Sequence, residues 1–345
     1  MKNKKIIVSV IILILVLIGY FTYKTYYKVY KEGALKEGFI YLKNDDGFTD
    51  LVKKIAPFIK DTTDFKWVAN KKKFHKIKSG RYFIRKGTSN NDLVNLLRSG
   101  RQDPIKLTFN NQNSLEDLAK RISEQVETDS LSLISSFTDK DFLAKSGFTK
   151  EQVLGMFIPN SYQVYWNISA DKLRNKMYKE YKRFWNSSRL SKAKKIHLSP
   201  IEVTTLASIV HKESAKKQER PIIAGLYLNR LRDGWPLQSD PTVIYAIKQK
   251  YGDDFKIRRV LYKNIEDVKD SPYNTYKVKG LPPSLIAMPD VSAIDAVLNA
   301  NKNDYFYMCA SVNRIGYHEF AKTLAQHNLN VKKYHKKKNR QGIKQ

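Results

Sequence analysis

The longest hydrophobic run in this chain lies close to the N-terminus. Residues 6–23 contain no charged side chain, and they follow a basic start at residues 1–5. As a helix, a run of this length spans about 27 Å, just enough to cross the hydrocarbon core of a bilayer. No small-residue cleavage site follows the run, so the pattern predicts an uncleaved signal anchor. The positive-inside rule favours a cytoplasmic start, although lysines also follow the run.

Shorter segments after the anchor predict a small α+β module over residues 39–105, preceded by a linker at residues 24–38. Strands are expected at residues 39–42 and 80–85, and helices at residues 48–59 and 90–98. Gly100 is placed to end the last of these helices. The lysine run at residues 71–73 is typical of a solvated face rather than of a specific site.

Residues 106–331 have the pattern of a larger domain of mixed helices and strands. Strands are expected at residues 105–109 and 305–312, the second of them buried, and helices from Ser114 and at residues 130–145, 171–185 and 292–299. Residues 332–345 are basic with little apolar content, which predicts a disordered tail. The expected fold class is therefore α+β, with an N-terminal transmembrane helix.

The stretch at residues 199–245 has the most specific local pattern. Ser199 can cap a helix, Pro200 suits its first position, and Glu202 completes a capping box. Helical spacing then produces an apolar stripe of Val203, Leu206, Ala207, Ile209 and Val210. Glu213 falls on the same helix face, so its side chain is predicted to point towards the interior.

An acidic side chain on an interior helix face loses hydration. Desolvation favours the neutral form, and a carboxylic acid kept protonated near neutral pH can serve as a general acid. The alternative is an ordinary ion pair on the helix face, because Lys216 and Lys217 lie three and four residues after Glu213. Helix geometry alone leaves both interpretations open.

A second helix and a polar turn follow. Apolar residues recur at helical spacing over residues 221–231, and Gly234 lies just beyond them. A turn of sequence W-P-L-Q-S-D-P-T begins at Trp235, and its Asp240 and Pro241 are expected to cap a third helix.

Several strings in this part of the chain occur together. They are L-A-S-I-V-x-K-E from Leu206, N-R-L from Asn229, P-L-Q-S-D-P-T-V-I-Y from Pro236, Y-N-T-Y from Tyr273 and G-L-P-P from Gly280. In order and spacing they resemble the endolytic murein transglycosylases, the YceG-like family of bacterial cell-wall enzymes, over nearly the whole chain after the anchor. Independent strings in the same order are far more specific than a lone motif. The resemblance implies that Glu213 is the catalytic acid. The chain departs from the family's pattern at His211, where the family often has Glu. This difference puts in doubt any supporting role of that position in catalysis.

The matched strings also supply candidate substrate-binding residues. Residues 156–166 are similar to the family's F-x-P-(D/N)-(S/T)-Y segment, which lines the substrate cleft. Aromatic faces in it suit a pyranose ring, and ordinary core aromatics are the alternative. The family's H-x-F string matches at His318 and is followed by T-L-A-x-H-N. The candidates are Asn160, Tyr162, Asn229, Arg230, Gln238, Ser239, Asp240, Thr242, Tyr245, Tyr273, Asn274, Thr275 and His318.

The resemblance also implies a reaction and a domain plan. Lytic transglycosylases cut the MurNAc-β-1,4-GlcNAc bond without water and leave a 1,6-anhydro end, so a single Glu can act as acid and then as base. A hydrolase normally needs a second carboxylate. Asp240 and Glu219 are the nearest candidates, and the resemblance gives Asp240 a structural role. The family's equivalent of residues 39–105 is a LysM-like subdomain, which either binds glycan or acts as a spacer ahead of the catalytic domain. No metal or organic cofactor is implied.

Charge and cysteine content narrow the choice of binding partner and exclude a disulfide-based fold. The formal net charge of +30 suggests an anionic partner such as nucleic acid, an acidic membrane surface or a cell-wall polymer. The single cysteine, Cys309, excludes an internal disulfide framework, and its apolar surroundings predict a small core residue. The resemblance favours a single-pass plasma-membrane protein with an extracytoplasmic catalytic domain. Its implied partners are peptidoglycan glycan strands and cell-wall synthases, and its implied role is to terminate glycan elongation.

Features of the sequence oppose two other function classes. A catalytically inactive glycan-binding scaffold is opposed by the intact Glu213 and the Q-S-D string at Gln238. A nucleic-acid binder fits the charge, but the extracytoplasmic position and the absence of a nucleic-acid motif oppose it.

Overall fold

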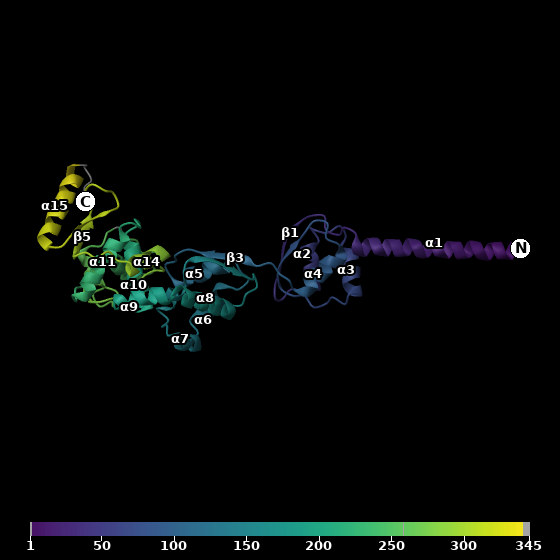
Figure 1. Ribbon diagram of the computed structural model, residues 1–345, viewed down its shortest axis with the longest axis horizontal. Coiled ribbons are helices and arrows are strands. Elements are labelled where there is room, and N and C mark those ends of the chain that lie inside the picture. Colours follow the sequence, from purple (N-terminus) through teal and green to yellow (C-terminus); the bar gives the residue numbers. More distant parts are fainter. Residues whose placement is uncertain (1, 258, 341–345) are drawn as a thin grey trace. The chain divides into compact units, whose positions relative to one another are not determined.

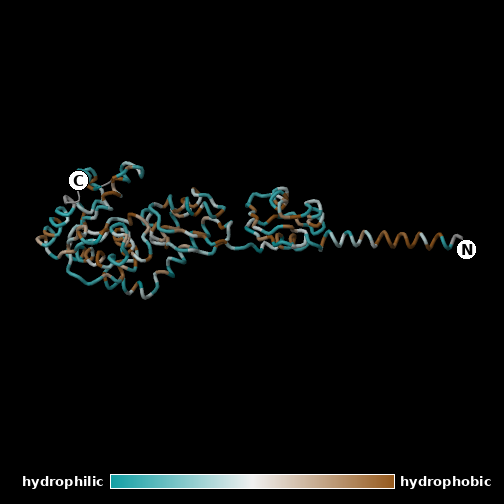
Figure 2. Tube along the Cα trace, turned by 90° about the horizontal axis from the view of Figure 1, so that it is seen from above, coloured by the Kyte–Doolittle hydropathy of each residue, from teal (hydrophilic) through white to brown (hydrophobic). Residues whose placement is uncertain are grey.

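The N-terminal apolar run forms one long helix, α1 (Lys2–Tyr30). The computed structural model describes residues 2–257 and 259–340. Residues Lys4–Tyr30 have a mean hydropathy of 2.7 in their most apolar window, and that window is fully exposed. Figure 2 shows this helix brown, the colour of hydrophobic residues, over most of its length. By length and composition it can cross a membrane.

Residues 24–38, predicted to form a linker, are joined closely to the fold that follows. Helix α1 continues to Tyr30, and Lys28 pairs with Asp64 at 2.8 Å. Ala34 is buried, and its amide donates to the Thr88 carbonyl. The apolar helix therefore enters the first folded unit without a free segment between them.

The first compact unit contains the chain up to Leu107, together with residues 125–128 and 162–169. Strand β1 (Gly38–Leu42) pairs antiparallel with β2 (Gly80–Ile84), and helices α2 (Phe48–Ile55), α3 (Thr62–Lys71) and α4 (Asn90–Ser99) complete it (Figure 1). Its core holds Ile40, Leu42, Leu51, Ile55, Phe65, Tyr82, Ile84 and Leu93. Helix α2 ends earlier than expected because Pro57 follows. Helix α3 was not expected, and Asp61 caps it by accepting from the Thr63 amide.

The second compact unit begins within β3 (Ile105–Phe109), which pairs with β4 (Asn160–Val164). Its first helices are α5 (Leu115–Ser123), α6 (Ser130–Phe137), α7 (Lys140–Ser146), the short 3-10 helix Val153–Met156, α8 (Ala170–Phe184) and α9 (Ser187–Lys195). The single helix expected at residues 130–145 is two helices, because the Asp139 side chain accepts from the Phe142 amide and starts α7.

Five helices surround the main core of the second unit. They are α10 (Pro200–Glu213), α11 (Arg220–Arg232), α12 (Asp240–Tyr251), α13 (Tyr262–Asp267) and α14 (Val291–Leu298). The predicted capping box of α10 is confirmed, since Ser199 accepts from the Glu202 amide and Glu202 accepts from the Ser199 amide. Its predicted apolar stripe is fully buried against α11, α12 and α14. The helix is thus fixed at its start and along one face.

A hairpin and a last helix complete the second unit. Strand β5 (Tyr307–Ala310) pairs antiparallel with β6 (His318–Ala321), and α15 (Leu324–Arg340) packs on both. Two expectations are wrong here. The strand expected to be buried is only partly covered, and its Cys309 is partly exposed. The basic tail is helical to Arg340, because contact with the hairpin orders it. Residues 341–345 lie outside the described residues.

Candidate active site

Glu213 is the last residue of α10, and its carboxyl group lies between two helices and a turn. Its Oε1 accepts a hydrogen bond from the Tyr227 hydroxyl of α11 at 2.9 Å. The same oxygen accepts a second bond from the Ser239 hydroxyl, just before α12. The side chain is partly exposed, and it opens into a cavity of about 310 Å³. The apolar stripe of α10 therefore ends in a carboxyl group that is held on one oxygen.

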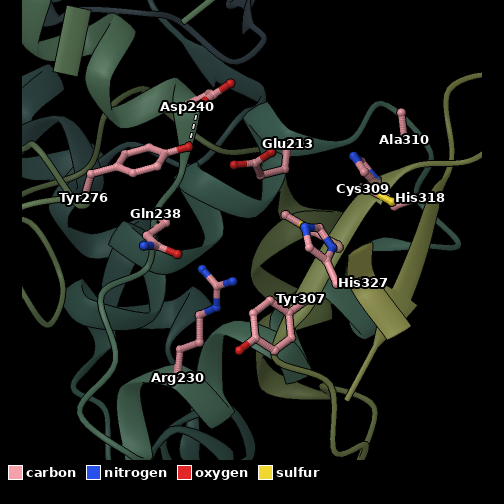
Figure 3. Close-up of a pocket in the computed structure, with 11 residues that line it drawn as sticks. Glu213, Arg230, Gln238, Asp240, Tyr276, Tyr307, Cys309, Ala310, His318 and His327 are labelled. Atoms are coloured by element: carbon pink, nitrogen blue, oxygen red, sulfur yellow. Dashed lines mark hydrogen bonds between the residues drawn. The ribbon is translucent and has the colours of Figure 1, made fainter. Parts of the chain in front are cut away.

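The cavity is built from segments that are far apart in the sequence. Its floor comes from α10, α11 and the turn before α12, and its wall comes from β5, β6 and α15 (Figure 3). The lining residues are Glu213, Arg230, Gln238, Asp240, Tyr276, Tyr307, Met308, Cys309, Ala310, His318 and His327.

The surroundings of Glu213 favour its protonated form. Burial raises the pKa of the carboxyl group above its ordinary value, and the charge of Asp240 acts in the same direction. The hydrogen bonds from Ser239 and Tyr227 and the charge of His318 oppose this rise without cancelling it. A carboxylic acid with a raised pKa, facing a cavity, is suited to donate a proton.

Replacing Glu213 by Gln should change how stability depends on pH. Because the folded-state pKa of Glu213 is raised, wild-type protein loses stability as pH rises from the unfolded value of about 4.3 through the folded value. Gln has no proton to release, so the variant should gain stability relative to wild type at alkaline pH and match it near pH 4. Thermal unfolding midpoints between pH 4 and 9 measure this. A constant difference between the two proteins would contradict it.

The turn that carries Ser239 is fixed by residues 273–276. The Gln238 amide donates to the Thr275 carbonyl at 2.9 Å, and the Ser239 amide donates to the Thr275 hydroxyl at 3.0 Å. Gln238 has a φ of 52°, a left-handed conformation that non-glycine residues rarely adopt. These bonds hold the Ser239 hydroxyl in place against Glu213.

Asp240 and Tyr276 form a pair at the edge of the cavity. The Tyr276 hydroxyl donates to Asp240 Oδ1 at 2.7 Å (Figure 3). Burial raises the pKa of Tyr276, so the hydroxyl remains a donor at neutral pH. Asp240 itself is exposed. Solvation and the hydrogen bond favour the charged form of Asp240, whereas the surroundings of Glu213 favour its protonated form.

Arg230 connects the cavity wall to its floor. Its Nε donates to the Phe306 carbonyl at 2.8 Å, and its Nη1 donates to the Leu237 carbonyl at 2.6 Å. The side chain is only 7% exposed, and burial lowers its pKa. The guanidinium group thus holds β5 against the turn before α12.

Two histidines line the wall and differ in their partners. The His318 amide donates to Glu219 Oε1 at 2.6 Å, and its Nδ1 lies 2.9 Å from Glu219 Oε2. His327 stacks on Tyr307 with ring centroids 5.4 Å apart. Burial and then Arg230 lower the pKa of His327, and its buried Nδ1 has no hydrogen-bond partner within the described residues. A neutral imidazole therefore offers a free polar atom close to the cavity.

The structure brings some of the sequence candidates to the cavity and leaves others in the surrounding framework. Arg230, Gln238, Asp240 and His318 line it with Glu213, and Ser239 contacts Glu213 directly. Asn229, Thr242, Tyr273, Asn274 and Thr275 are buried, and each bonds within the protein. The Tyr245 ring lies 4.7 Å from the Tyr273 ring. Asn160 and Tyr162 lie on β4 and do not line this cavity.

Sequence reasoning missed four aromatic or imidazole groups of the site. Tyr227 looked like part of an apolar helix face, and Tyr307 like part of a buried strand. Tyr276 and His327 lie inside the matched strings but were not selected. His211 pairs with Asp290 at 3.4 Å and does not line the cavity. Among residues 2–257 and 259–340, no His, Cys, Asp and Glu side chains are grouped as metal ligands would be.

The chain is similar to known proteins in both sequence and structure. The sequence model of the YceG-like family matches residues 40–333. An endolytic murein transglycosylase of Bacillus subtilis is 31% identical over 297 residues, which cover 81% of this chain and 79% of that protein. One of Streptococcus pneumoniae is 27% identical over 303 residues, and the match spans about half of its length, 54%. The crystal structure of a YceG-like protein of Listeria monocytogenes matches with a TM-score of 0.55 and 25% identity, over 85% of this chain and 98% of that one.

Proposed function

Since this chain belongs to the YceG-like family, whose curated relatives are endolytic murein transglycosylases, we propose that it cleaves MurNAc-β-1,4-GlcNAc bonds within peptidoglycan strands and leaves 1,6-anhydro ends. The observation that carries this proposal is the enclosed carboxyl group of Glu213, which has a raised pKa and faces a cavity. The enzyme is a lyase of the lytic transglycosylase class.

In the proposed reaction Glu213 protonates the glycosidic oxygen of the leaving GlcNAc. The bond between that oxygen and C1 of MurNAc breaks, and the 6-hydroxyl of MurNAc closes onto C1 as its proton is removed. Tyr227 and Ser239 occupy Oε1 of Glu213, which leaves Oε2 as the oxygen that delivers the proton. Buried donors that do not move during the reaction need no reorganisation in the transition state.

A hydrolase is the main chemical alternative, and Asp240 is the second carboxylate at the cavity. Its exposure and its bond from Tyr276 suit charge stabilisation and turn structure more than nucleophilic attack. Incubation of purified sacculi with the protein, followed by mass spectrometry of the fragments, tests the proposal. Anhydro-ended fragments support it, whereas fragments with reducing ends only would replace it with hydrolysis.

We also propose that α1 anchors the enzyme in the plasma membrane with residues from Tyr23 onward outside the cytoplasm. The support is the exposed apolar helix behind a basic start. Protease added to intact spheroplasts should degrade the bulk of the chain. Protection of that part while the membrane is sealed would reverse the proposed orientation.

The first unit is proposed to be a LysM-like glycan-binding subdomain. Deletion of residues 39–105 should weaken binding to sacculi but leave some cleavage, because all lining residues of the cavity belong to the second unit. Residues 125–128 and 162–169 lose their partners in this variant, so its thermal unfolding has to be recorded alongside sedimentation with sacculi. Unchanged binding by a folded variant would identify the unit as a spacer.

An anchored enzyme of this kind is proposed to act on strands that are still being extended. Nascent glycan is made at the outer face of the plasma membrane, where the anchor would hold the enzyme. A cut there ends elongation of that strand, and the cell-wall synthases are the partners that such a position implies.

A further inference from the structure

His318 lies in the cavity wall with its imidazole held from behind by a buried carboxylate. Glu219 is 3% exposed and does not line the cavity. It accepts from the Ser214 hydroxyl at 3.0 Å and from the His318 amide at 2.6 Å, and its Oε2 lies 2.9 Å from His318 Nδ1. The start of α11 therefore fixes both the backbone and the ring of the first residue of β6.

This contact decides which nitrogen of His318 carries the proton. A carboxylate only accepts hydrogen bonds, so Nδ1 must donate to Glu219. In the neutral ring Nε2 is then unprotonated. Within the part of the chain that the structure describes, Nε2 has no hydrogen-bond partner, and His318 lines the same cavity as Glu213 (Figure 3). A buried carboxylate behind an imidazole with a free Nε2 is the arrangement by which histidine acts as a base.

After it has protonated the leaving oxygen, Glu213 is poorly arranged to accept the proton of the 6-hydroxyl. Its Oε1 is held by Tyr227 and Ser239, so the group cannot rotate without breaking both bonds. Those bonds also stabilise the carboxylate that forms after proton donation, so it is a weaker base than burial alone would make it. The closing 6-hydroxyl and the leaving oxygen are different atoms of the substrate, and a fixed Oε2 serves one of them best.

We propose that His318 is a second catalytic residue, which takes the proton of the 6-hydroxyl as it closes onto C1, and that Glu219 is its positioning residue. The inference rests on the proposed transglycosylase function and adds a base to it. Glu213 gives its proton to the leaving oxygen, and the bond between that oxygen and C1 breaks. The 6-oxygen bonds to C1, and its proton passes to His318 Nε2. Return of that proton from His318 to the Glu213 carboxylate restores the starting state.

The charged and titratable groups around His318 come from every element of the cavity. They are Glu213 of α10, Glu219 just before α11, Arg230 of α11, Asp240 of α12, Tyr276 of the turn at residues 273–276, Tyr307 and Cys309 of β5, and His327 of α15. Of these groups, Glu219 alone forms a hydrogen bond with the His318 ring within the part of the chain that the structure describes. It is therefore the group whose change should alter the ring's tautomer.

The products of a His318→Gln variant test this inference. Without the base, the enclosed 6-hydroxyl has no acceptor for its proton, while a water molecule that attacks C1 can release its proton to solvent. We expect total cleavage to fall about 10²-fold or more, and the share of reducing ends to rise at the expense of anhydro ends. Mass spectrometry of digested sacculi measures both quantities in one sample.

Glu219→Gln is the second variant, because it keeps the size of the side chain. The Gln amide can donate to Nδ1, which favours the tautomer of His318 that carries its proton on Nε2. The share of reducing ends should therefore rise, as it does in His318→Gln. Glu319→Gln is the matched control, since Glu319 neighbours His318 but bonds Ser311. It should keep the wild-type product ratio.

Slower cleavage with purely anhydro products in both variants would overturn the base role of His318 and leave the proposed function standing. Reducing ends alone from wild-type protein would overturn the proposed function, and this inference with it. A product shift in both variants but not in Glu319→Gln is the result expected.

Discussion

Replacing Glu213 by Gln should reduce cleavage of peptidoglycan by about 10²- to 10⁴-fold while the protein stays folded and binds glycan. Gln is nearly isosteric, and its carbonyl oxygen can still accept from Tyr227 and Ser239. It has no proton to give to the leaving oxygen, so only the chemical step is lost. Release of soluble fragments from sacculi measures the rate, and co-sedimentation with sacculi measures binding.

Asp240→Asn is the control for that experiment. It removes a charge at the cavity edge but can keep the bond from Tyr276. In the transglycosylase reaction its product should still carry the anhydro ring, whereas a hydrolase that used Asp240 would be as damaged as by Glu213→Gln. If Glu213 were only a partner of a nearby lysine, its loss would cost at most about 0.5 kcal/mol of stability and no activity. Near wild-type cleavage by Glu213→Gln would therefore remove the basis of the proposed function.

Replacing Arg220 by Met should lower the free energy of unfolding by about 3 kcal/mol. The Arg220 side chain is buried, and its Nη1 donates to both carboxylate oxygens of Asp290 at 2.8 Å. Asp290 in turn caps α14 by accepting from the Ala293 amide at 2.8 Å. Met fills similar volume but leaves a partly buried carboxylate with His211 as its remaining basic partner. Urea denaturation of the two proteins measures the difference.

The same pair should set part of the protein's acid stability. Burial alone would raise the pKa of Asp290, but hydrogen bonds from Arg220, Ser292 and the Ala293 amide lower it to about 2. Because the folded-state pKa is depressed, its contribution is complete above the unfolded value of about 3.9 and is lost as pH falls from there through about 2. Arg220→Met should flatten this loss between pH 4 and 2. An equally steep loss in the variant would show that Arg220 does not set the pKa of Asp290.

Local patterns in the sequence were sufficient for the elements that carry Glu213. The capping box at Ser199 and the stripe along α10 depend on neighbours three and four residues away, and both are present. The end of α4 at Gly100, in a left-handed conformation, is of the same kind. Helix α3 was not predicted because its threonines and lysines interrupt the apolar periodicity. Its three buried residues are sufficient to pack it against the rest of the unit.

The rest of the site depends on contacts between distant residues. Glu219 and His318 are 99 positions apart, and no local sequence pattern around either residue predicts their contact. Periodicity correctly marked Tyr227 as interior, but only the packed helices place its hydroxyl on Glu213. Strand β5 was predicted to be buried because its residues are apolar, yet it borders a cavity and is only partly covered. Hydrophobic periodicity predicts which face of a helix or strand is buried, but it does not predict which residues pack against that face.

The path of the backbone between the two compact units has a consequence for how this protein can be divided. The chain passes from one unit to the other after Leu107, Glu124, Thr128, Ser161 and Ser169. A module with a single connection can be released by one proteolytic cut and exchanged between proteins as a cassette. Here one cut at any crossing leaves the remaining crossings intact, so the nicked pieces stay interwoven until the protein is denatured. Shuffling by recombination at one junction would likewise break the first unit rather than transfer it.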